Sequence, residues 1–307
     1  MRIVSLLPSA TEILYALGLG DNVVGVSHEC DFPEAAKKKP SVITPRVDPS
    51  LPSAEIDAQV RQLTARGESL YQIRDDLLRK LKPDLIITQD LCHVCAASPG
   101  DLAHALGSFE HRPEVLTLTP TSLMDVWEDV RRVGRATGRE QEAEELAQSL
   151  HDRVERVYEA ASAQRGKPRV ACLEWLSPVY VPGHWVPEMI ESAKGLNLFG
   201  CAGQPSFAVG NDDVLRSRPE VIVIMPCGFG PQRALEEFRA LGLAEEWKDS
   251  PAFHHHRVFA VDANSYFSRP GPRLAEGVEL LAQILHPALG LKVPEGSYAR
   301  FRAEEAA

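Results

Sequence analysis

The chain of 307 residues is 44% hydrophobic and 25% charged and has a net charge of −10, which is typical of a soluble globular protein long enough for two domains. The negative charge argues against a nucleic-acid partner, because binding phosphate groups requires a basic surface. No apolar run approaches the ~20 residues of a membrane span, so we do not expect a membrane-embedded protein.

The first 33 residues predict a strand, a helix and a second strand in close succession. Apolar runs at 3–7 and 23–26 flank an amphipathic segment at 10–17. Ser9 is well placed as the helix N-cap, and Glu12 three residues later completes a capping box. Because apolar strands on both sides of a helix favour parallel pairing, this unit predicts an α/β domain.

Polar side chains follow both of these strands. Ser9 comes after the first strand, and His28 and Glu29 come after the second. In open α/β sheets, ligands bind beyond the carboxyl ends of the strands. We therefore expect these three residues to contribute to a ligand site, with a simple turn contact as the alternative for Glu29.

Residues 45–70 predict an insertion beside that site. Prolines stand at 45, 49 and 52, and an acidic amphipathic segment follows at 54–64. Helical spacing of apolar residues resumes at 70–81, and a strand is predicted at 85–88.

The loop after that strand contains the motif Cys92-His93-Val94-Cys95. Two cysteines three positions apart can chelate a soft metal or form a redox pair, so Cys92 and Cys95 are candidate metal ligands. Direct contact of Cys92, His93 and Cys95 with an organic ligand, and plain loop packing, are the alternatives. The six cysteines of the chain do not show the pattern of a small disulfide-rich protein.

The rest of the chain predicts a long helix and a second α/β unit. Residues 122–163 contain no proline, and their apolar residues recur at helical spacing, with Gly134 and Gly138 where a bend or break is tolerated. Strands and helices then alternate again. We expect an amino-terminal lobe at 1–121, an inter-lobe helix at 122–165, a carboxy-terminal lobe at 166–290 and a frayed polar tail at 291–307.

One loop region of the second lobe concentrates large flat side chains and polar groups, namely Glu174, Trp175, Tyr180, His184 and Trp185. Rings with little rotamer freedom make good walls for a planar ligand, so we expect these residues to contact one. His184 is also a candidate axial metal ligand. Core packing is the alternative for the two tryptophans, and a surface or helix-capping role is the alternative for His184.

The segments LLPSATEILYALGLGDNVVGVSHECDFP and LKPDLIIT resemble ABC-transporter-type substrate-binding proteins of the iron-siderophore and cobalamin uptake family, the helical backbone metal receptors. The cobalamin-binding members are the most similar kind, and the resemblance covers roughly residues 1–290. It implies a periplasmic-binding-protein-like fold: two Rossmann-like α/β lobes with parallel sheets, joined by one long rigid helix, with the ligand in the cleft between them.

The resemblance also implies further site residues. Arg269 lies where relatives place a ligand-contacting arginine, in a cleft-closing segment that also contains Tyr266, and Cys227 lies in another cleft loop. Asp76 and Asp212 match the acids through which relatives dock on a membrane permease. A solvated helix face explains these two acids equally well.

We therefore expect a monomer that binds a cobalamin-like corrinoid, or another metal chelate or tetrapyrrole, and delivers it to an ABC permease. We expect neither catalysis nor a covalently bound cofactor. One alternative is a cytoplasmic enzyme or cofactor-handling protein that uses the Cys, His and Glu residues of the cleft. A metal-ion-binding protein is another. The native-looking Met1 and the lack of a secretory leader favour a cytoplasmic location, and a removed leader would make the location periplasmic or lipid-anchored.

Overall fold

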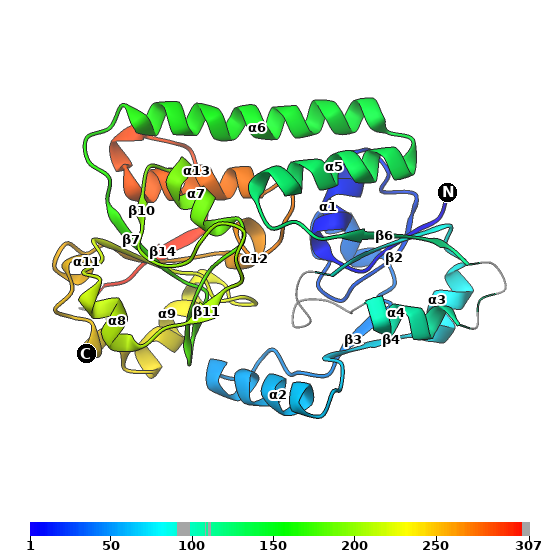
Figure 1. Ribbon diagram of the computed structural model, residues 1–307, viewed down its shortest axis with the longest axis horizontal. Coiled ribbons are helices and arrows are strands. Elements are labelled where there is room, and N and C mark those ends of the chain that lie inside the picture. Colours follow the sequence, from blue (N-terminus) through cyan, green and yellow to red (C-terminus); the bar gives the residue numbers. More distant parts are fainter. Residues whose placement is uncertain (91–98, 108, 110–111, 303–307) are drawn as a thin grey trace.

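The computed structural model describes residues 1–90, 99–107, 109 and 112–302 and contains two α/β lobes that lie side by side beneath one long helix (Figure 1). The amino-terminal lobe is built on a parallel sheet with the strand order β2-β1-β5-β6. Its strands are β1 (Ile3–Ser5), β2 (Val23–Val26), β5 (Leu85–Gln89) and β6 (Glu114–Leu118). The predicted α/β class with parallel sheets is confirmed.

Helices cover both faces of this sheet, because neighbouring strand residues point to opposite sides. Ile3 faces α1 (Pro8–Ala16) and α5 (Leu123–Thr137), whereas Val4 faces α3 (Asp75–Leu81) and α4 (Pro99–Leu106). A short 3-10 helix, η1 (Glu34–Lys38), follows β2. The strands are therefore buried on both faces, as their nearly continuous apolar sequences predict.

The carboxy-terminal lobe repeats this arrangement with the strand order β10-β7-β12-β13-β14. Its strands are β7 (Arg169–Leu173), β10 (Leu196–Asn197), β12 (Val221–Ile224), β13 (Val258–Val261) and the antiparallel edge strand β14 (Tyr298–Arg300). One face is covered by α7 (Val186–Ser192) and α13 (Leu274–Leu285). The other is covered by α8 (Asn211–Arg216), α9 (Pro231–Ala240), α10 (Leu243–Glu246) and α11 (Pro251–His254).

Smaller elements complete this lobe. An antiparallel sheet follows β7, with β8 (Trp175–Leu176), β9 (Val179–Val181) and β11 (Phe207–Ala208) in the order β11-β9-β8. The other elements are α12 (Ala263–Tyr266) after β13 and η2 (Pro287–Leu289) after α13.

The inter-lobe connection is two helices rather than one, which corrects the expectation for 122–165. α5 ends at Gly138, which adopts a left-handed φ of 67°, and α6 (Glu140–Ser162) then runs back across both lobes (Figure 1). The two helices pack tightly, because a Cβ atom added at Gly134 would lie 2.3 Å from the Cβ of Ala143. Of these two helices, α6 is the one that runs across both lobes (Figure 1).

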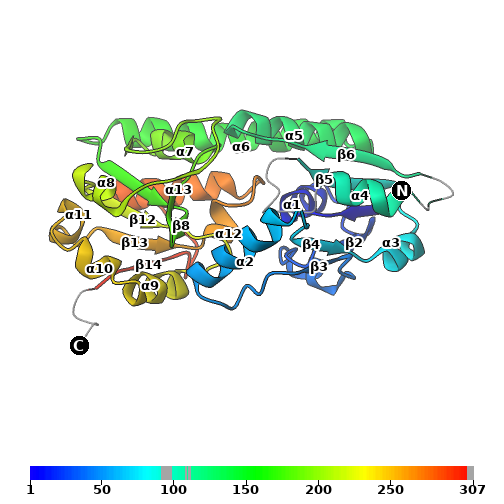
Figure 2. The same cartoon turned by 60° about the horizontal axis from the view of Figure 1, so that its bottom comes forward.

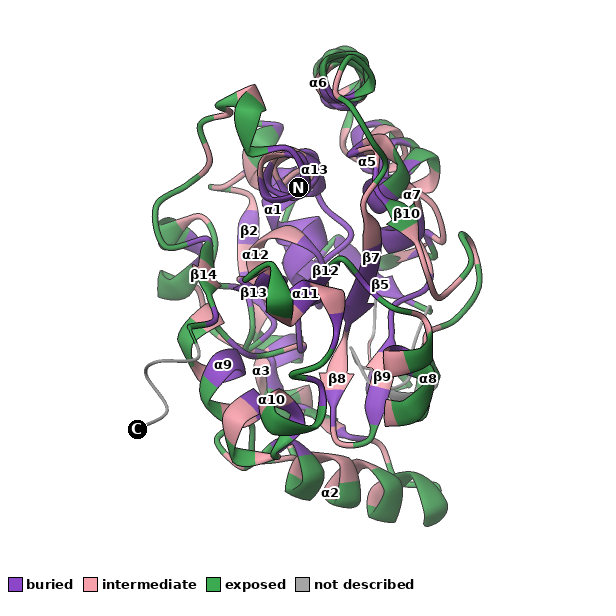
Figure 3. Ribbon diagram, turned by 90° about the vertical axis from the view of Figure 1, so that its left-hand side faces the viewer, coloured by how far each residue is buried: buried purple, intermediate pink, exposed green. Residues whose placement is uncertain are grey.

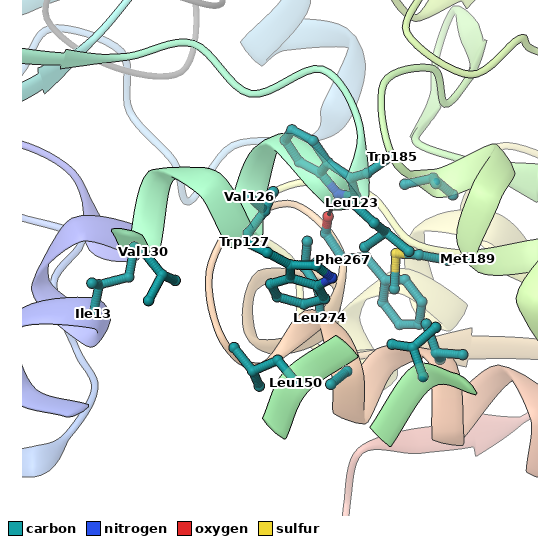
Figure 4. Close-up of a cluster of buried hydrophobic side chains, with 14 of the residues drawn as sticks. Ile13, Leu123, Val126, Trp127, Val130, Leu150, Trp185, Met189, Phe267 and Leu274 are labelled. Atoms are coloured by element: carbon teal, nitrogen blue, oxygen red, sulfur yellow. Dashed lines mark hydrogen bonds between the residues drawn. The ribbon is translucent and has the colours of Figure 1, made fainter. Parts of the chain in front are cut away.

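One apolar core continues from lobe to lobe beneath α6. Trp127 of α5 lies among side chains of both lobes, including Leu150 of α6, Phe267 and Leu274 (Figure 4). The side chain of Trp127 is 2% exposed. Because close-packed cores resist deformation, α6 and the core beneath it form a rigid connection between the lobes, which we call the spine.

The segment expected as a polar tail belongs to the second lobe as far as the structure describes it. Residues 298–300 form β14, which pairs with β13, and Phe301 is buried in the core of the lobe. The expectation of a frayed tail at 291–307 is therefore wrong for 298–301. Adding an edge strand satisfies the outer hydrogen-bonding groups of β13 and buries an aromatic ring.

The predicted insertion forms a strap, which we define as residues 46–70. It leaves β3 (Ile43–Pro45), contains α2 (Ser53–Ala65) and returns through β4 (Tyr71–Ile73), which pairs with β3 in antiparallel fashion. α2 lies on the side of the molecule opposite α6 (Figure 3) and crosses in front of the junction of the lobes in Figure 2. In the described part of the chain, no helix has the length and apolarity needed to cross a membrane.

Candidate ligand-binding cleft

A cavity of about 440 Å³ lies between the two lobes and the strap. This volume lies within the range of small-molecule sites, which are mostly apolar with a few polar groups. Its apolar lining comes from the amino-terminal lobe, the strap and the second lobe, and includes Leu7, Pro8, Val47, Ile56, Val60, Leu70, Trp175 and Phe229. The polar lining includes Ser9, His28, Glu29, Asp31, Gln89, Asn264, Ser268 and Arg269.

The start of α1 lies at the cavity, as the strand-end argument predicts. Pro8 is the first helical residue and Leu7 takes the N-cap position without a side-chain cap, so the expected N-cap role of Ser9 is wrong. Proline suits this position because its missing N–H has no helical partner there. Ser9 Oγ is buried, and no hydrogen-bond partner for it is found among the described residues.

Glu12 does not complete a capping box. It binds Arg273 of the second lobe through two hydrogen bonds, of 2.6 and 2.9 Å, and the Glu12 side chain is 4% exposed. Burial raises the pKa of Glu12 above its usual value, although hydrogen bonding to Arg273 acts in the opposite direction. This pair joins the two lobes.

A second ion pair between the lobes involves Arg269. Its guanidinium group donates to Asp31 Oδ1 at 2.5 Å and to the carbonyl oxygen of Glu29 at 3.0 Å. The expected arginine therefore lines the cavity, but its donors are engaged by the chain after β2. The Asp31 side chain is half-exposed, so this pair presents both a cation and a carboxylate to the cavity.

His28 presents a neutral imidazole to the cavity. Its ring lies 5.6 Å from the ring of Tyr71, and its Nε2 lies 3.8 Å from the Glu29 carboxylate. Burial lowers the pKa of His28, outweighing the opposite effect of Glu29. At neutral pH the imidazole can therefore accept a hydrogen bond from a ligand or donate its lone pair to a metal that the ligand carries.

An aromatic wall faces these groups from the second lobe. The rings of Trp175 and Phe229 meet edge to face with 5.6 Å between centroids, and the Arg233 guanidinium lies 3.7 Å above the Phe229 ring. Trp175 Nε1 is buried without a hydrogen-bond partner in the described part of the chain. The wall thus offers flat apolar surface and one unused donor.

Cys227 lies beside this wall. Its thiol donates to Ser268 Oγ at 3.2 Å, and its sulfur is 3.9 Å from Glu174 Oε1. Glu174 itself is not among the residues that line the cavity. Among the described residues, no group of three or more His, Cys, Asp or Glu side chains is arranged to hold a metal ion.

Four other expected contacts lie outside the cavity lining. Trp185 is 4% exposed in the core, where its Nε1 donates to the carbonyl oxygen of Phe267 at 2.7 Å (Figure 4). His184 has a positive φ of 50° and stacks on Trp185. Tyr180 pairs with Trp175 across β8–β9, and Tyr266 packs against the main core. The structure therefore does not bring these four residues together with the cavity-lining groups, and their contact with a ligand stays a prediction.

Three expected site residues, Cys92, His93 and Cys95, lie outside the described residues. The cavity is also lined by residues that are not among the expected site residues, notably Asp31, Tyr71 and Phe229. Phe229 follows β12 and Asp31 follows β2, so the strand-end rule could have found both. Tyr71 lies on β4 at the end of the strap, and no sequence signal identified that strand.

The two expected docking acids are exposed at the starts of helices on different lobes. Asp76 is in the first turn of α3, has a side chain that is 98% exposed, and forms an ion pair with Arg79. Asp212 is exposed in the first turn of α8. Both side chains are accessible to a partner.

A comparison with protein families and curated relatives gives a consistent result. The model of a family described as periplasmic binding protein matches residues 3–265. An uncharacterized ABC transporter substrate-binding lipoprotein of Bacillus subtilis is 28% identical over 93% of this chain and 80% of its own length. The vitamin B12-binding protein of Vibrio vulnificus is 25% identical over 92% of this chain and 89% of its own length.

Solved structures show the same fold. A periplasmic heme-binding protein from Roseiflexus in apo form gives a TM-score of 0.71 at 24% identity, with 94% of this chain and 98% of that chain covered. The periplasmic vitamin B12 binding protein of Vibrio cholerae gives 0.66 at 23% identity, with 95% and 98% covered. A lipoprotein among the relatives gives no support to the expected cytoplasmic location.

Proposed function

This chain belongs to the periplasmic binding protein family, and on that premise we propose that it is the non-enzymatic substrate-binding component of an ABC-type uptake system. Its ligand is a planar, metal-bearing cofactor of the corrinoid or tetrapyrrole class, held between the lobes as a guest and not as a covalent cofactor. The curated relatives named for vitamin B12 and the structural neighbours named for heme support this ligand class.

The observation that carries the proposal is the composition of the cavity. Trp175, Phe229 and Tyr71 supply aromatic surface, and the rest of the lining combines aliphatic side chains with the polar groups described above. Aromatic and aliphatic walls with a few polar groups suit the faces of a macrocycle and its polar side arms. The imidazole of His28, whose pKa is lowered by burial, would meet a metal centre or a side-arm donor of that ligand.

The proposal assigns the exposed acids to the partner. Asp76 and Asp212 lie on separate lobes and would each pair with a basic residue of the permease. We place the protein on the outer side of the membrane, free or lipid-anchored, because the Bacillus subtilis relative is named a lipoprotein.

The proposal is tested by identifying the small molecule that copurifies with the protein. Protein purified without added ligand from cells supplied with cobalt and iron is expected to carry an absorbing cofactor, visible in its absorption spectrum and identified by mass spectrometry. A protein that emerges colourless and also fails to take up cobalamins or haem would contradict the proposed ligand class.

A further inference from the structure

The strap crosses from the amino-terminal lobe to the carboxy-terminal lobe at the open side of the cleft. Arg233 of α9 donates to the carbonyl oxygens of Pro49 and Leu51, each at 2.7 Å. Ile56 of α2 packs against the apolar cluster of the second lobe. Although the strap belongs in sequence to the first lobe, it is therefore held by the second.

A single carboxylate of the second lobe caps α2. Glu237 Oε1 accepts from the backbone N–H of Ser53 at 2.8 Å and from its Oγ at 2.6 Å. The residue at the N-cap position is Pro52, which makes no side-chain cap. Because the first N–H groups of a helix have no helical acceptor, Glu237 supplies what the local sequence lacks.

This attachment is small. Within α2 only Ser53 is buried, and Ile56 is half-buried. Segments with few buried apolar contacts open at much lower free energy than the whole molecule. The spine formed by α6 and the continuous core lies on the opposite side of the molecule (Figures 1 and 3). The lobes are therefore joined more weakly through the strap than through the spine.

The attachment and the cavity wall are physically connected. Val47, Ile56 and Val60 of the strap line the cavity, and Phe229 lines it from the second lobe. The Arg233 guanidinium, which holds the strap, also lies 3.7 Å above the Phe229 ring. Release of the strap would therefore uncover the cavity and loosen its aromatic wall together.

We propose that the strap is the third wall of the binding site and the door through which ligand is exchanged. Its aliphatic inner face contacts an apolar edge of the ligand, and Glu237 and Arg233 of α9 keep it closed. The contact with ligand depends on the function proposed above, whereas the opening is a property of the unliganded protein and can be tested separately.

The thiol of Cys227 reports access to the cavity, because it lines the cavity and is partly buried, whereas Cys201 is exposed and lies outside the lining. The unliganded protein is alkylated with iodoacetamide, and mass spectrometry of its peptides gives the alkylation rates of Cys227 and Cys201 in one sample. Glu237→Ala is expected to raise the Cys227 rate about fivefold, the effect of losing a helix cap of ordinary strength. The Cys201 rate should not change.

The matched control is Glu236→Ala, which removes the same charge from an exposed neighbour on α9. Ser53→Ala, which removes only one of the two hydrogen bonds, should give an intermediate rate and serves if Glu237→Ala folds poorly. Tryptic cleavage after Arg61 and Arg66 in the strap reports strap release directly. Faster cleavage with an unchanged Cys227 rate, or no change in either measurement, would overturn the proposal.

The ligand arm uses cyanocobalamin and haemin. For the probe that binds, Glu237→Ala should raise both its association rate and its dissociation rate in stopped-flow measurements. If it raises neither rate, the strap is not the door. If neither probe binds the parent protein, the ligand class proposed above fails, and the alkylation experiment still decides whether the strap opens the cavity.

Discussion

Trp175 is the residue whose surroundings best fit a role in binding. Its ring forms the cavity wall with Phe229, and its Nε1 is buried without a partner in the described part of the chain. A buried donor without an acceptor costs free energy that a ligand acceptor would recover. The same residue therefore supplies flat apolar contact and one specific hydrogen bond.

Replacing Trp175 by alanine is expected to weaken ligand binding at least about tenfold, because central aromatic residues dominate binding energy. Phe207→Ala is the control, since Phe207 is an exposed aromatic residue on the same small sheet. Isothermal titration with the bound cofactor measures both variants. Equal losses in the two variants, or none in Trp175→Ala, would remove Trp175 from the site.

Asp129 of α5 predicts a pH effect on stability. Burial raises its pKa from 3.8 to about 6 despite a hydrogen bond of 2.7 Å from Arg132. A carboxyl group with a raised folded-state pKa binds its proton more tightly in the folded state. Its contribution to stability is therefore greatest below about pH 4 and declines as the pH rises to about 6, by at most about 3 kcal/mol.

Asp129→Asn should abolish this decline. The difference in unfolding free energy between variant and parent is expected to move in favour of the variant as the pH rises from about 4 to about 7. Urea denaturation at a series of pH values measures it. Parallel curves for the two proteins would show that Asp129 is not the titrating group.

The residues of the site were predictable where they follow a strand. Six of the candidate residues line the cavity, and all but Arg269 lie at or close after a strand end: Ser9, His28, Glu29, Trp175, Cys227 and Arg269. Trp185 lies in the core, which is the alternative that the sequence left open for it. The sequence could not show that Asp31 holds Arg269 from the other lobe.

At the level of elements, periodicity identified the lobes better than it identified boundaries. Residues 70–81 were expected to be helical, but β4 takes residues 71–73 and only α3 is helical. Tertiary pairing with β3 overrides the helical spacing there. The strap was recognised as an insertion beside the cleft, whereas its attachment to α9 depends on contacts between distant residues.

The turn between α5 and α6 predicts two different glycine effects. Gly138→Ala places a side chain at φ 67°, with no atom within 4 Å of the new Cβ, and should cost about 1 kcal/mol. Gly134→Ala puts its Cβ 2.3 Å from the Cβ of Ala143, and overpacking of that kind costs about 1–3 kcal/mol. Chemical denaturation should rank Gly134→Ala as the more damaging change, and the reverse order would contradict the close packing of the two helices.

At the scale of the whole molecule, two ion pairs join the lobes, and of these Glu12–Arg273 is the more buried. Glu12→Gln would leave Arg273 buried without its counter-charge, and removing one partner of a buried pair costs about 3 kcal/mol or more. Glu279→Gln is the comparison, because its partner Arg153 is a third exposed and such pairs contribute about 1 kcal/mol or less. Thermal denaturation should show a much larger loss of stability for Glu12→Gln, and equal losses would mean that the Glu12–Arg273 pair does not hold the lobes together.

The central claim is that the inter-lobe cavity binds a planar, metal-bearing cofactor. The most direct measurement is isothermal titration of ligand-free protein with cyanocobalamin and, separately, with haemin. One of the two is expected to bind at a ratio of 1:1 with a Kd of about 1 µM or tighter. Absence of binding to both would contradict the account.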